Sequence, residues 1–211
     1  RDKNGFGLGT NYNDTGIASL AYDESLNMYY AVFYYKEEIL FSTGTENSSG
    51  TITWTNGIVV ISNISYQRPK IVLDPDGSLY VYYATVNDSL EGITKVKRSN
   101  DSGLTWKDVD TTAELTLGNI NTTSIFNSGK IGLTTFNGQN LSIDTLRRTV
   151  VDNVDKIERL GTSVKIKENP AHTSNLLVDN AGTYHVAYQS GLGLTLSFAV
   201  STDNGNTWKD N

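Results

Sequence analysis

The chain contains no cysteine, only three prolines and one methionine, and fewer basic than acidic residues. The absence of cysteine excludes disulfides, thiol chemistry and thiolate metal sites. A net charge of −6 with no basic stripe argues against a nucleic-acid partner. No apolar run approaches the length of a membrane-spanning helix, which argues against membrane insertion. The composition is that of a globular protein, and a chain of 211 residues is long enough to enclose a hydrophobic core.

The residues that are abundant favour β-structure. The chain has twelve tyrosines, and most of its polar residues are Asn, Ser, Thr and Gly rather than charged residues. Aromatic and β-branched side chains fit half-buried strands, while Asn, Ser and Gly supply the turns between strands. The composition therefore predicts an all-β protein with many turns.

An eight-residue pattern, Ser-x-Asp-x-Gly-x-Thr-Trp, occurs at 99–106 and again at 201–208. Each shared residue suits a tight turn between two strands. Asp accepts hydrogen bonds from nearby backbone N–H groups, Gly takes a positive φ, and Trp adds a large apolar surface. The shared positions are Ser99, Asp101, Gly103, Thr105 and Trp106 in the first copy and Ser201, Asp203, Gly205, Thr207 and Trp208 in the second.

This pattern resembles the Asp-box, or BNR repeat, of sialidases and other secreted β-propeller proteins. The resemblance implies a propeller of the sialidase-like superfamily more firmly than it implies an activity, because one fold carries many functions. In that family the boxes lie in the loop before the outermost strand, away from the catalytic face. We therefore expect Asp101 and Asp203 to be structural, with a carbohydrate or ion contact as the alternative.

The spacing of the boxes predicts a repeat of about 51 residues. Trp106 and Trp208 are 102 residues apart, which is twice 51. One period before Trp106 lies Trp54, in a degenerate box where Glu46 or Asn47 takes the place of Asp. A third strand, the box and an outer strand would then recur in each repeat.

A second marker, an acidic turn between two strands, gives the same period. Its four occurrences are separated by 51, 53 and 52 residues. Together the two markers predict an all-β β-propeller over residues 1–211, either a single small propeller or, as we favour, an arc of a larger one. Its four-stranded antiparallel blades are expected at approximately 15–65, 66–118, 119–170 and 171–211. The turn positions are Asp23, Asp74, Asn127 and Asp179.

Each repeat is expected to form an antiparallel meander. In the third repeat the box is missing, and we expect the charge run 152–159 to be a solvated loop, with a short helical turn as the alternative. The expected strands are 18–22, 28–35, 39–42 and 58–61 in the first repeat, 70–73, 79–84, 93–98 and 113–117 in the second, 141–146 in the third, and 194–200 in the fourth.

The last blade is expected to lack its outer strand, because only three residues follow Trp208. Residues before Thr15 complete the blade, or the protein continues past Asn211, or a neighbouring copy lends a strand. The segment 5–9 is rich in glycine and makes a poor outer strand, which favours truncation or completion by another molecule. An open edge of this kind suits strand addition by copies of the chain.

The sialidase resemblance implies an active site with three arginines, a Tyr–Glu pair and an Asp acid/base. The family's Phe/Tyr-Arg-Ile-Pro motif is similar to Tyr66-Gln67-Arg68-Pro69, but here no residue separates Arg from Pro and the motif opens the second blade. Arg68 is the one catalytic candidate. Because the rest of the catalytic set cannot be assembled, the sequence favours a non-catalytic protein.

No cofactor or metal is expected. The two histidines, His172 and His185, are too few for a His-based metal cage. The acidic turn 74–77 offers oxygen ligands but lacks the spacing of an EF-hand. No glycine-rich phosphate loop lies between a strand and a helix, so nucleotide binding has no support.

Asn-x-Ser/Thr sequons occur in modest excess and favour a secreted or surface glycoprotein. We therefore expect an extracellular location or a place on a cell or virion surface. The sequons are Asn13, Asn47, Asn63, Asn87, Asn100, Asn121 and Asn140.

The function predicted from the sequence is a non-catalytic, extracellular or surface-exposed module. It would bind a carbohydrate or protein ligand or assemble with copies of itself. One alternative is a fragment of a sialidase-like glycoside hydrolase. Another is a structural subunit of an extracellular fibre or virion.

Overall fold

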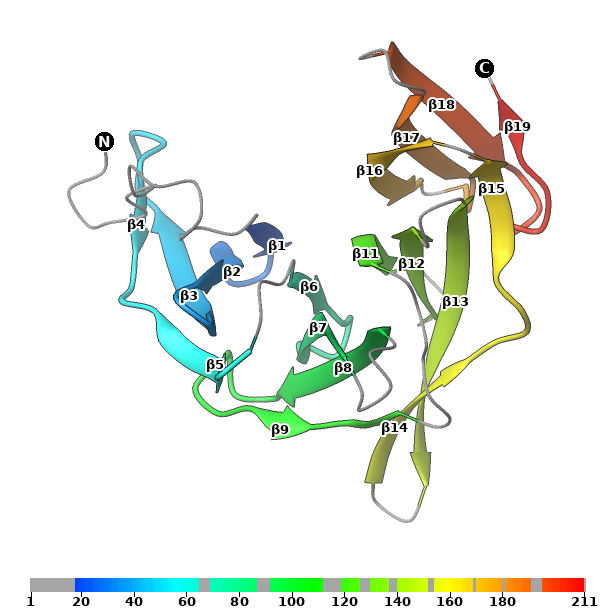
Figure 1. Cartoon of the computed structure of the whole chain (residues 1–211). Helices are drawn as coiled ribbons and strands as arrows, with labels where there is room; N and C mark the ends of the chain where they lie inside the picture. The colour runs from blue at the N-terminus through cyan, green and yellow to red at the C-terminus, as the bar shows by residue number, and fades with distance from the viewer. Residues whose placement is uncertain are drawn as a thin grey trace. The chain divides into compact units, whose positions relative to one another are not determined.

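The computed structural model is all-β, and the residues that it describes form strands β1 to β19 without a helix (Figure 1). Two compact units make up the chain, Arg1–Thr85 with Val96–Asp108 and Val86–Lys95 with Val109–Asn211. The described residues are 18–64, 69–86, 92–111, 119–125, 130–136, 140–151, 154–168, 170–179, 181–190 and 195–210.

Sheet 1 and sheet 2 are consecutive antiparallel meanders. In sheet 1 the last two strands both pair with the third, so they divide the outer position of the blade. Sheet 1 consists of β1 (Ser19–Asp23), β2 (Met28–Tyr35), β3 (Glu38–Glu46), β4 (Ile52–Trp54) and β5 (Ile58–Ser62). Sheet 2 consists of β6 (Lys70–Leu73), β7 (Leu79–Val86), β8 (Gly92–Ser99) and β9 (Lys107–Asp108).

Sheet 3 and sheet 4 repeat this order with additions to sheet 3. There β14 and β15 both pair with β13, and β10 joins β14 in a short parallel ladder. Sheet 3 consists of β10 (Asp110–Thr111), β11 (Asn119–Ile125), β12 (Lys130–Phe136), β13 (Asn140–Val151), β14 (Val154–Arg159) and β15 (Val164–Glu168). Sheet 4 consists of β16 (Pro170–Val178), β17 (Tyr184–Ser190), β18 (Thr195–Ser201) and β19 (Lys209–Asp210).

Each pair of sheets encloses an apolar core. Alternate residues of a strand point to the same face, so one face of each sheet becomes apolar. Tyr30 and Phe41 of sheet 1 pack with Val81 of sheet 2, and Ile143 of sheet 3 packs with Val186 of sheet 4. All five side chains are at most 2% exposed. Alternation is clear in β17, where Tyr184, Val186 and Tyr188 are buried, whereas residues 79–83 of β7 are buried on both faces.

The predicted fold class is confirmed: the described residues form four sheets of β-propeller type, antiparallel except for the two-residue β10–β14 ladder. The bounds predicted for 28–35 and 70–73 agree with β2 and β6 at both ends. Most other predicted strands agree to within a few residues at their ends, because apolar alternation and turn residues mark them locally. The predicted strand 113–117 lies outside the described residues. On the side of β8 away from β7, the strand that pairs with it is β9, directly after the first box.

The expected loop at 152–159 was wrong, because Val154–Arg159 forms β14. Its charged side chains meet partners on β13, Glu158 with Arg147 on one face and Asp155 with Arg148 on the other, and a strand can therefore carry them. The expected absence of an outer strand in the last blade is also corrected. Lys209 pairs with Val200 and Asp210 with Ala199, so the two residues after Trp208 already form a short ladder.

Candidate functional site

Two acidic turns in neighbouring sheets line one cleft. The first, between β1 and β2, is built around Asp23. Its Oδ1 accepts hydrogen bonds from the backbone N–H and the hydroxyl of Ser25, at 2.9 and 2.6 Å, and from the N–H of Leu26 at 3.2 Å. The Ser25 hydroxyl, followed by the two backbone donors, lowers the pKa of Asp23 although partial burial acts in the opposite direction. None of these bonds uses Oδ2.

The second turn, between β6 and β7, reverses the chain over residues 74–78. The Asp74 N–H donates to the Ser78 carbonyl, the Gly77 N–H donates to the Asp74 carbonyl, and both distances are 2.8 Å. Gly77 has φ +83°, a conformation that favours glycine. Asp76 Oδ1 accepts the Ser78 N–H at 2.9 Å, and its Oδ2 lies 3.7 Å from Nη2 of Arg98.

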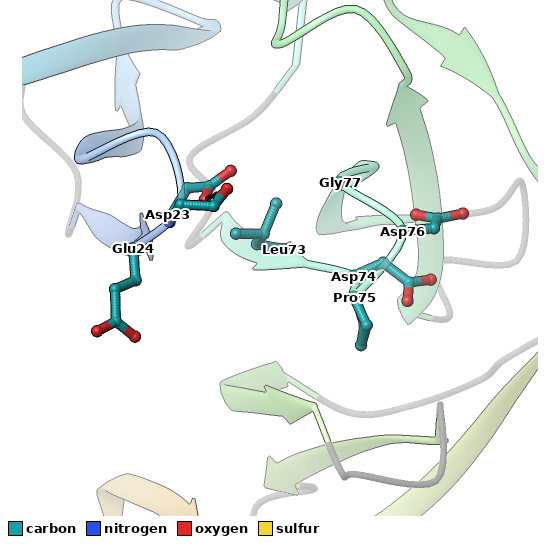
Figure 2. A pocket seen from close by; sticks show the side chains of 8 residues that line it. Asp23, Glu24, Leu73, Asp74, Pro75, Asp76 and Gly77 are labelled. Atoms are coloured by element: carbon teal, nitrogen blue, oxygen red, sulfur yellow. Dashed lines mark hydrogen bonds between the residues drawn. The ribbon is translucent and has the colours of Figure 1, made fainter.

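The cleft between these turns has a volume of about 690 Å³. Figure 2 shows Asp23 and Glu24 on one turn and residues 74–77 on the other, with Leu73 between them. The lining combines four carboxylates with a small apolar surface from Leu73 and Pro75. A site of this kind accepts hydrogen bonds from hydroxyl groups and repels anions.

Metal binding finds no geometric support in the described ranges, where no three His, Asp or Glu side chains converge as metal ligands. Within those ranges there is also no helix long and apolar enough to cross a membrane. His185 lies on β17 and contacts Asp179 Oδ2 through Nε2 at 3.1 Å. The side chain of His172 lies outside the described part of the chain.

In both boxes the carboxylate is used within its own turn. Asp101 accepts the Ser99 hydroxyl on Oδ1 at 2.7 Å, and the Thr105 N–H and hydroxyl on Oδ1 and Oδ2 at 2.9 and 2.5 Å. The second box repeats this geometry at 2.7, 2.9 and 2.6 Å around Asp203. The threonine hydroxyls lead the hydrogen bonds that lower the pKa of both carboxyl groups to about 2. Both oxygens of each carboxylate therefore accept hydrogen bonds from within their own turn.

The box tryptophans close these corners. Trp106 donates its indole N–H to the Gly103 carbonyl at 3.1 Å, and Trp208 donates to the Gly205 carbonyl at 3.0 Å. The Trp106 ring meets the edge of Phe41 from sheet 1, with centroids 5.2 Å apart. The box thus joins its own sheet to the preceding one.

In the degenerate first box, Asn47 rather than Glu46 takes the hydrogen-bonding role of Asp. Asn47 Oδ1 accepts the N–H groups of Ser49 and Thr51, both at 3.0 Å, and the Ser49 hydroxyl at 2.7 Å. Glu46 instead accepts the Tyr29 hydroxyl at 2.7 Å. The corner survives with an amide in place of a carboxylate because only acceptor oxygens are needed.

The remaining predicted site residues are scattered. Arg68, Asn13 and Asn87 lie outside the described residues. Asn121 lies on β11, without a described side chain, and Asn140 is half-buried at the start of β13. The exposed sequon asparagines are Asn47, Asn63 and Asn100.

A buried polar cluster in sheet 3 was not anticipated. Asp144 is fully buried and accepts the hydroxyls of Ser163 at 2.6 Å and Thr135 at 3.1 Å. Arg159 Nε lies 3.1 Å from Asp144 Oδ1. These four residues come from three strands and a connection, so their sequence spacing gives no indication of the cluster.

The acidic cleft was missed for a different reason. Asp23 and the Asp74–Asp76 pair stood out in the sequence as turn residues, each explained by its own hairpin. Their convergence follows from the packing of β1 beside β6, which the repeat period alone does not specify. The sequence did contain one indication of this cleft: the two acidic turns occupy the same position in consecutive repeats.

The sequence matches no family model, and no curated protein is significantly similar to it. Many solved structures share the fold. The Hadza microbial sialidase Hz136 aligns with TM-score 0.64 and 14% identity, over 94% of this chain and 46% of that one. A GH43 protein of Bacillus licheniformis, the BlXynB K247S mutant, aligns with TM-score 0.62 and 13% identity, over 94% of this chain and 42% of that one. The endo-arabinase of Bacteroides thetaiotaomicron aligns with TM-score 0.63 and 11% identity, over 92% of this chain and 78% of that one.

These identities establish the fold alone. The chain spans less than half the length of the sialidase and of the GH43 protein. Its sheets therefore belong to the same propeller architecture as these glycoside hydrolases, and activity, substrate and partners are separate questions.

Proposed function

We propose that the chain is a non-catalytic, surface-exposed propeller module that binds a neutral glycan in the cleft between the β1–β2 and β6–β7 turns. The observation that carries this proposal is that four acidic residues, Asp23, Glu24, Asp74 and Asp76, line one cleft. The propeller fold, which the chain shares with glycoside hydrolases, supports a carbohydrate rather than another hydroxyl-bearing ligand.

The chemistry of the lining favours a neutral sugar. Carboxylates accept short, charge-assisted hydrogen bonds from hydroxyl groups. Leu73 and Pro75 offer an apolar surface to the C–H groups of a pyranose or furanose ring. An anionic sugar such as a sialic acid would meet four carboxylates, and its own carboxylate would be repelled.

The state of the carboxylates supports binding rather than catalysis. A glycosidase acid needs a raised pKa so that it carries a proton near neutral pH. The pKa of Asp23 is instead lowered by the Ser25 hydroxyl and by backbone donors. Asp76 accepts the backbone N–H of Ser78 and lies near Arg98, so part of its carboxylate is engaged within its own sheet.

A fragment of a glycoside hydrolase is the second candidate. It is favoured by the solved structures of similar fold, which include a sialidase and GH43 proteins. Arg68 would then belong to a substrate-binding set completed by other residues. Hydrolysis of a fluorogenic glycoside by the purified chain, abolished by Arg68→Ala, would favour this candidate over the binding module.

The test of glycan binding is calorimetric titration with neutral oligosaccharides, beside sialylated ones of matched length. Glu24→Gln removes one cleft charge at an exposed position, so the fold is expected to stay intact. We expect affinity to fall about five- to thirtyfold, the loss of one hydrogen bond to a charged group at roughly 1–2 kcal/mol.

Glu37→Gln is the matched control. Glu37 is an exposed carboxylate in the β2–β3 turn, which the antiparallel strand order places at the opposite end of sheet 1. Its replacement should leave affinity unchanged. Equal affinity of Glu24→Gln and wild type, or tighter binding of the sialylated ligands, would refute the assignment of the cleft.

A further inference from the structure

The dipeptide Asn-Gly occurs four times in the chain. In such a pair the backbone nitrogen of the glycine can attack the side-chain amide carbon of the asparagine, because glycine has no side chain that shields its nitrogen. The structure describes two of the pairs, Asn56-Gly57 in sheet 1 and Asn204-Gly205 in sheet 4. The other two, Asn4-Gly5 and Asn137-Gly138, lie outside the described residues. The same dipeptide can therefore be compared in two structural settings.

The Asn204-Gly205 pair is built into the second box. The Gly205 N–H donates to the Ser201 Oγ at 2.9 Å, and this hydrogen bond is buried. Two residues further on, Asp203 accepts the N–H and the hydroxyl of Thr207, which closes the same corner. A nitrogen that keeps its hydrogen bond in this corner is not available to attack Asn204. The attack therefore requires local opening of the box.

Backbone conformation and packing explain why this pair is present. Asn204 has φ +59°, and Ser102 takes the same position in the first box with φ +57°. Asparagine tolerates this left-handed conformation better than most residues. Gly205 has φ +84°, and a Cβ built on it would lie 3.1 Å from Cε2 of the buried Tyr184. Both residues are thus required by the corner in which they lie.

The Asn56-Gly57 pair has neither kind of constraint. Both residues are exposed and lie between β4 and β5. In the part of the chain that the structure describes, neither the Asn56 side chain nor the Gly57 N–H makes a hydrogen bond. The φ of Gly57 is outside the left-handed region, and a Cβ built on it would meet Leu40 at 3.4 Å, an ordinary contact. The nitrogen of Gly57 is therefore accessible to the neighbouring amide.

The residues on either side of this pair are held on β3. The Thr55 N–H donates to the Thr43 carbonyl at 2.8 Å, and the Thr43 N–H donates to the Thr55 Oγ1 at 3.0 Å. After the pair, Ile58 is in register with Phe41. A reaction between the Asn56 side chain and the Gly57 nitrogen therefore needs neither ladder to open.

From this contrast we propose that Asn56 is a site of spontaneous deamidation in the folded protein, whereas Asn204 is protected by its box. The Gly57 nitrogen forms a bond to Cγ of Asn56 and loses its proton, and the side-chain amide nitrogen leaves as ammonia. Water then opens the cyclic imide at either of its carbonyl groups, which gives aspartate or isoaspartate. The net reaction consumes water and releases ammonia, so it needs no oxidant, reductant or cofactor.

The products change sheet 1 in two ways. Each adds a negative charge at position 56, and isoaspartate also inserts a methylene group into the backbone between β4 and β5. Asparagine is among the residues that limit the chemical stability of proteins at high temperature. The proposal identifies which Asn-Gly pair of the described residues reacts first, and it does not rest on glycan binding.

Peptide mapping by mass spectrometry tests the proposal in the wild-type chain. The folded protein is incubated in mildly alkaline buffer, and the gain in mass from amide to acid is followed in the peptides that contain Asn56 and Asn204. We expect conversion at Asn204 to be at least about tenfold slower, because opening a buried, hydrogen-bonded corner reduces the reactive fraction. In urea the two sites should convert at similar rates, because the dipeptide is the same.

Two variants separate the causes. Gly57→Ala fits without a clash and shields the nitrogen, so it should slow conversion at Asn56 and leave Asn204 unchanged. Ser201→Ala removes the acceptor of the Gly205 N–H, so it should speed conversion at Asn204 and leave Asn56 unchanged. Circular dichroism checks that both variants are folded. Conversion at Asn204 as fast as at Asn56 in the folded wild type would overturn the proposal, as would an Asn56 that reacts in urea but stays intact in the folded chain.

Discussion

Replacing Gly103 with Ala tests whether packing, in addition to backbone geometry, requires glycine in the first box. Gly103 has φ +89°, and a Cβ built on it would lie 2.0 Å from Cε1 and 2.3 Å from Cζ of Phe41. Phe41 is 1% exposed and lies between Tyr30 and Trp106, so its ring has little room to move. The substitution therefore combines an unfavourable φ with a clash inside the core of the first unit.

The two contributions can be separated within the same unit. Gly77 has φ +83° and nothing within 4 Å of its Cβ position, so Gly77→Ala carries only the backbone cost of about 1–2 kcal/mol. Gly103→Ala adds overpacking of about 1–3 kcal/mol. We expect the free energy of unfolding, from urea titration, to fall by roughly 2–5 kcal/mol for Gly103→Ala. The second unit offers a matched pair, Gly205→Ala with Tyr184 at 3.1 Å and Gly182→Ala in open space.

The expected order of destabilisation is Gly103 above Gly205, and both above Gly77 and Gly182. If Gly103→Ala lost no more free energy of unfolding than Gly77→Ala, the packing argument would be refuted, because both variants share the backbone cost. A loss of stability confined to the Gly77 and Gly182 variants would contradict it as well. Circular dichroism at low denaturant checks that each variant starts from the folded state.

Further perturbations address charge and buried polar groups. The carboxyl groups of Asp101 and Asp203 have a pKa of about 2, below the usual 3.9 of an unfolded chain, so the stability they contribute is complete above about pH 4 and is lost as pH falls toward 2. The unfolding midpoint should decline in that window, and replacing both with Asn should flatten the decline. Asp144→Ala should lower the free energy of unfolding by about 2–4 kcal/mol, because Arg159 and Ser163 lose a buried partner. Asp144→Asn, which keeps an acceptor for Ser163, should cost less in the same titration.

Local chemistry made much of this fold predictable from the sequence. The strand at 70–73 lies before an acidic turn whose Gly77 must adopt a positive φ, so its end is marked in the sequence. In both boxes the hydrogen bonds span at most four residues, which is why the pattern alone indicates a corner. Interactions of such short range depend little on the rest of the chain.

Features that depend on distant partners were not predictable in this way. The run 152–159 has the composition of a solvated loop, yet its residues 154–159 form β14, where Glu158 meets Arg147 and Asp155 meets Arg148 across the ladder. Neither pairing is visible until the register of β13 is known. The same holds for the acidic cleft, whose two turns come together only when β1 and β6 lie side by side.

In sheet 3, long-range interactions hold the corner of the blade in place of the local hydrogen bonds of a box. It has no box, and its chain turns back through the long hairpin of β13 and β14. Sheets 2 and 4 hold the corner with one carboxylate inside a short turn, and sheet 1 does so with the Asn47 amide. This hairpin instead uses ion pairs and the buried Asp144. A blade corner thus requires a fixed acceptor network rather than a particular sequence. That is why the period of the fold persists through a repeat in which its motif is lost.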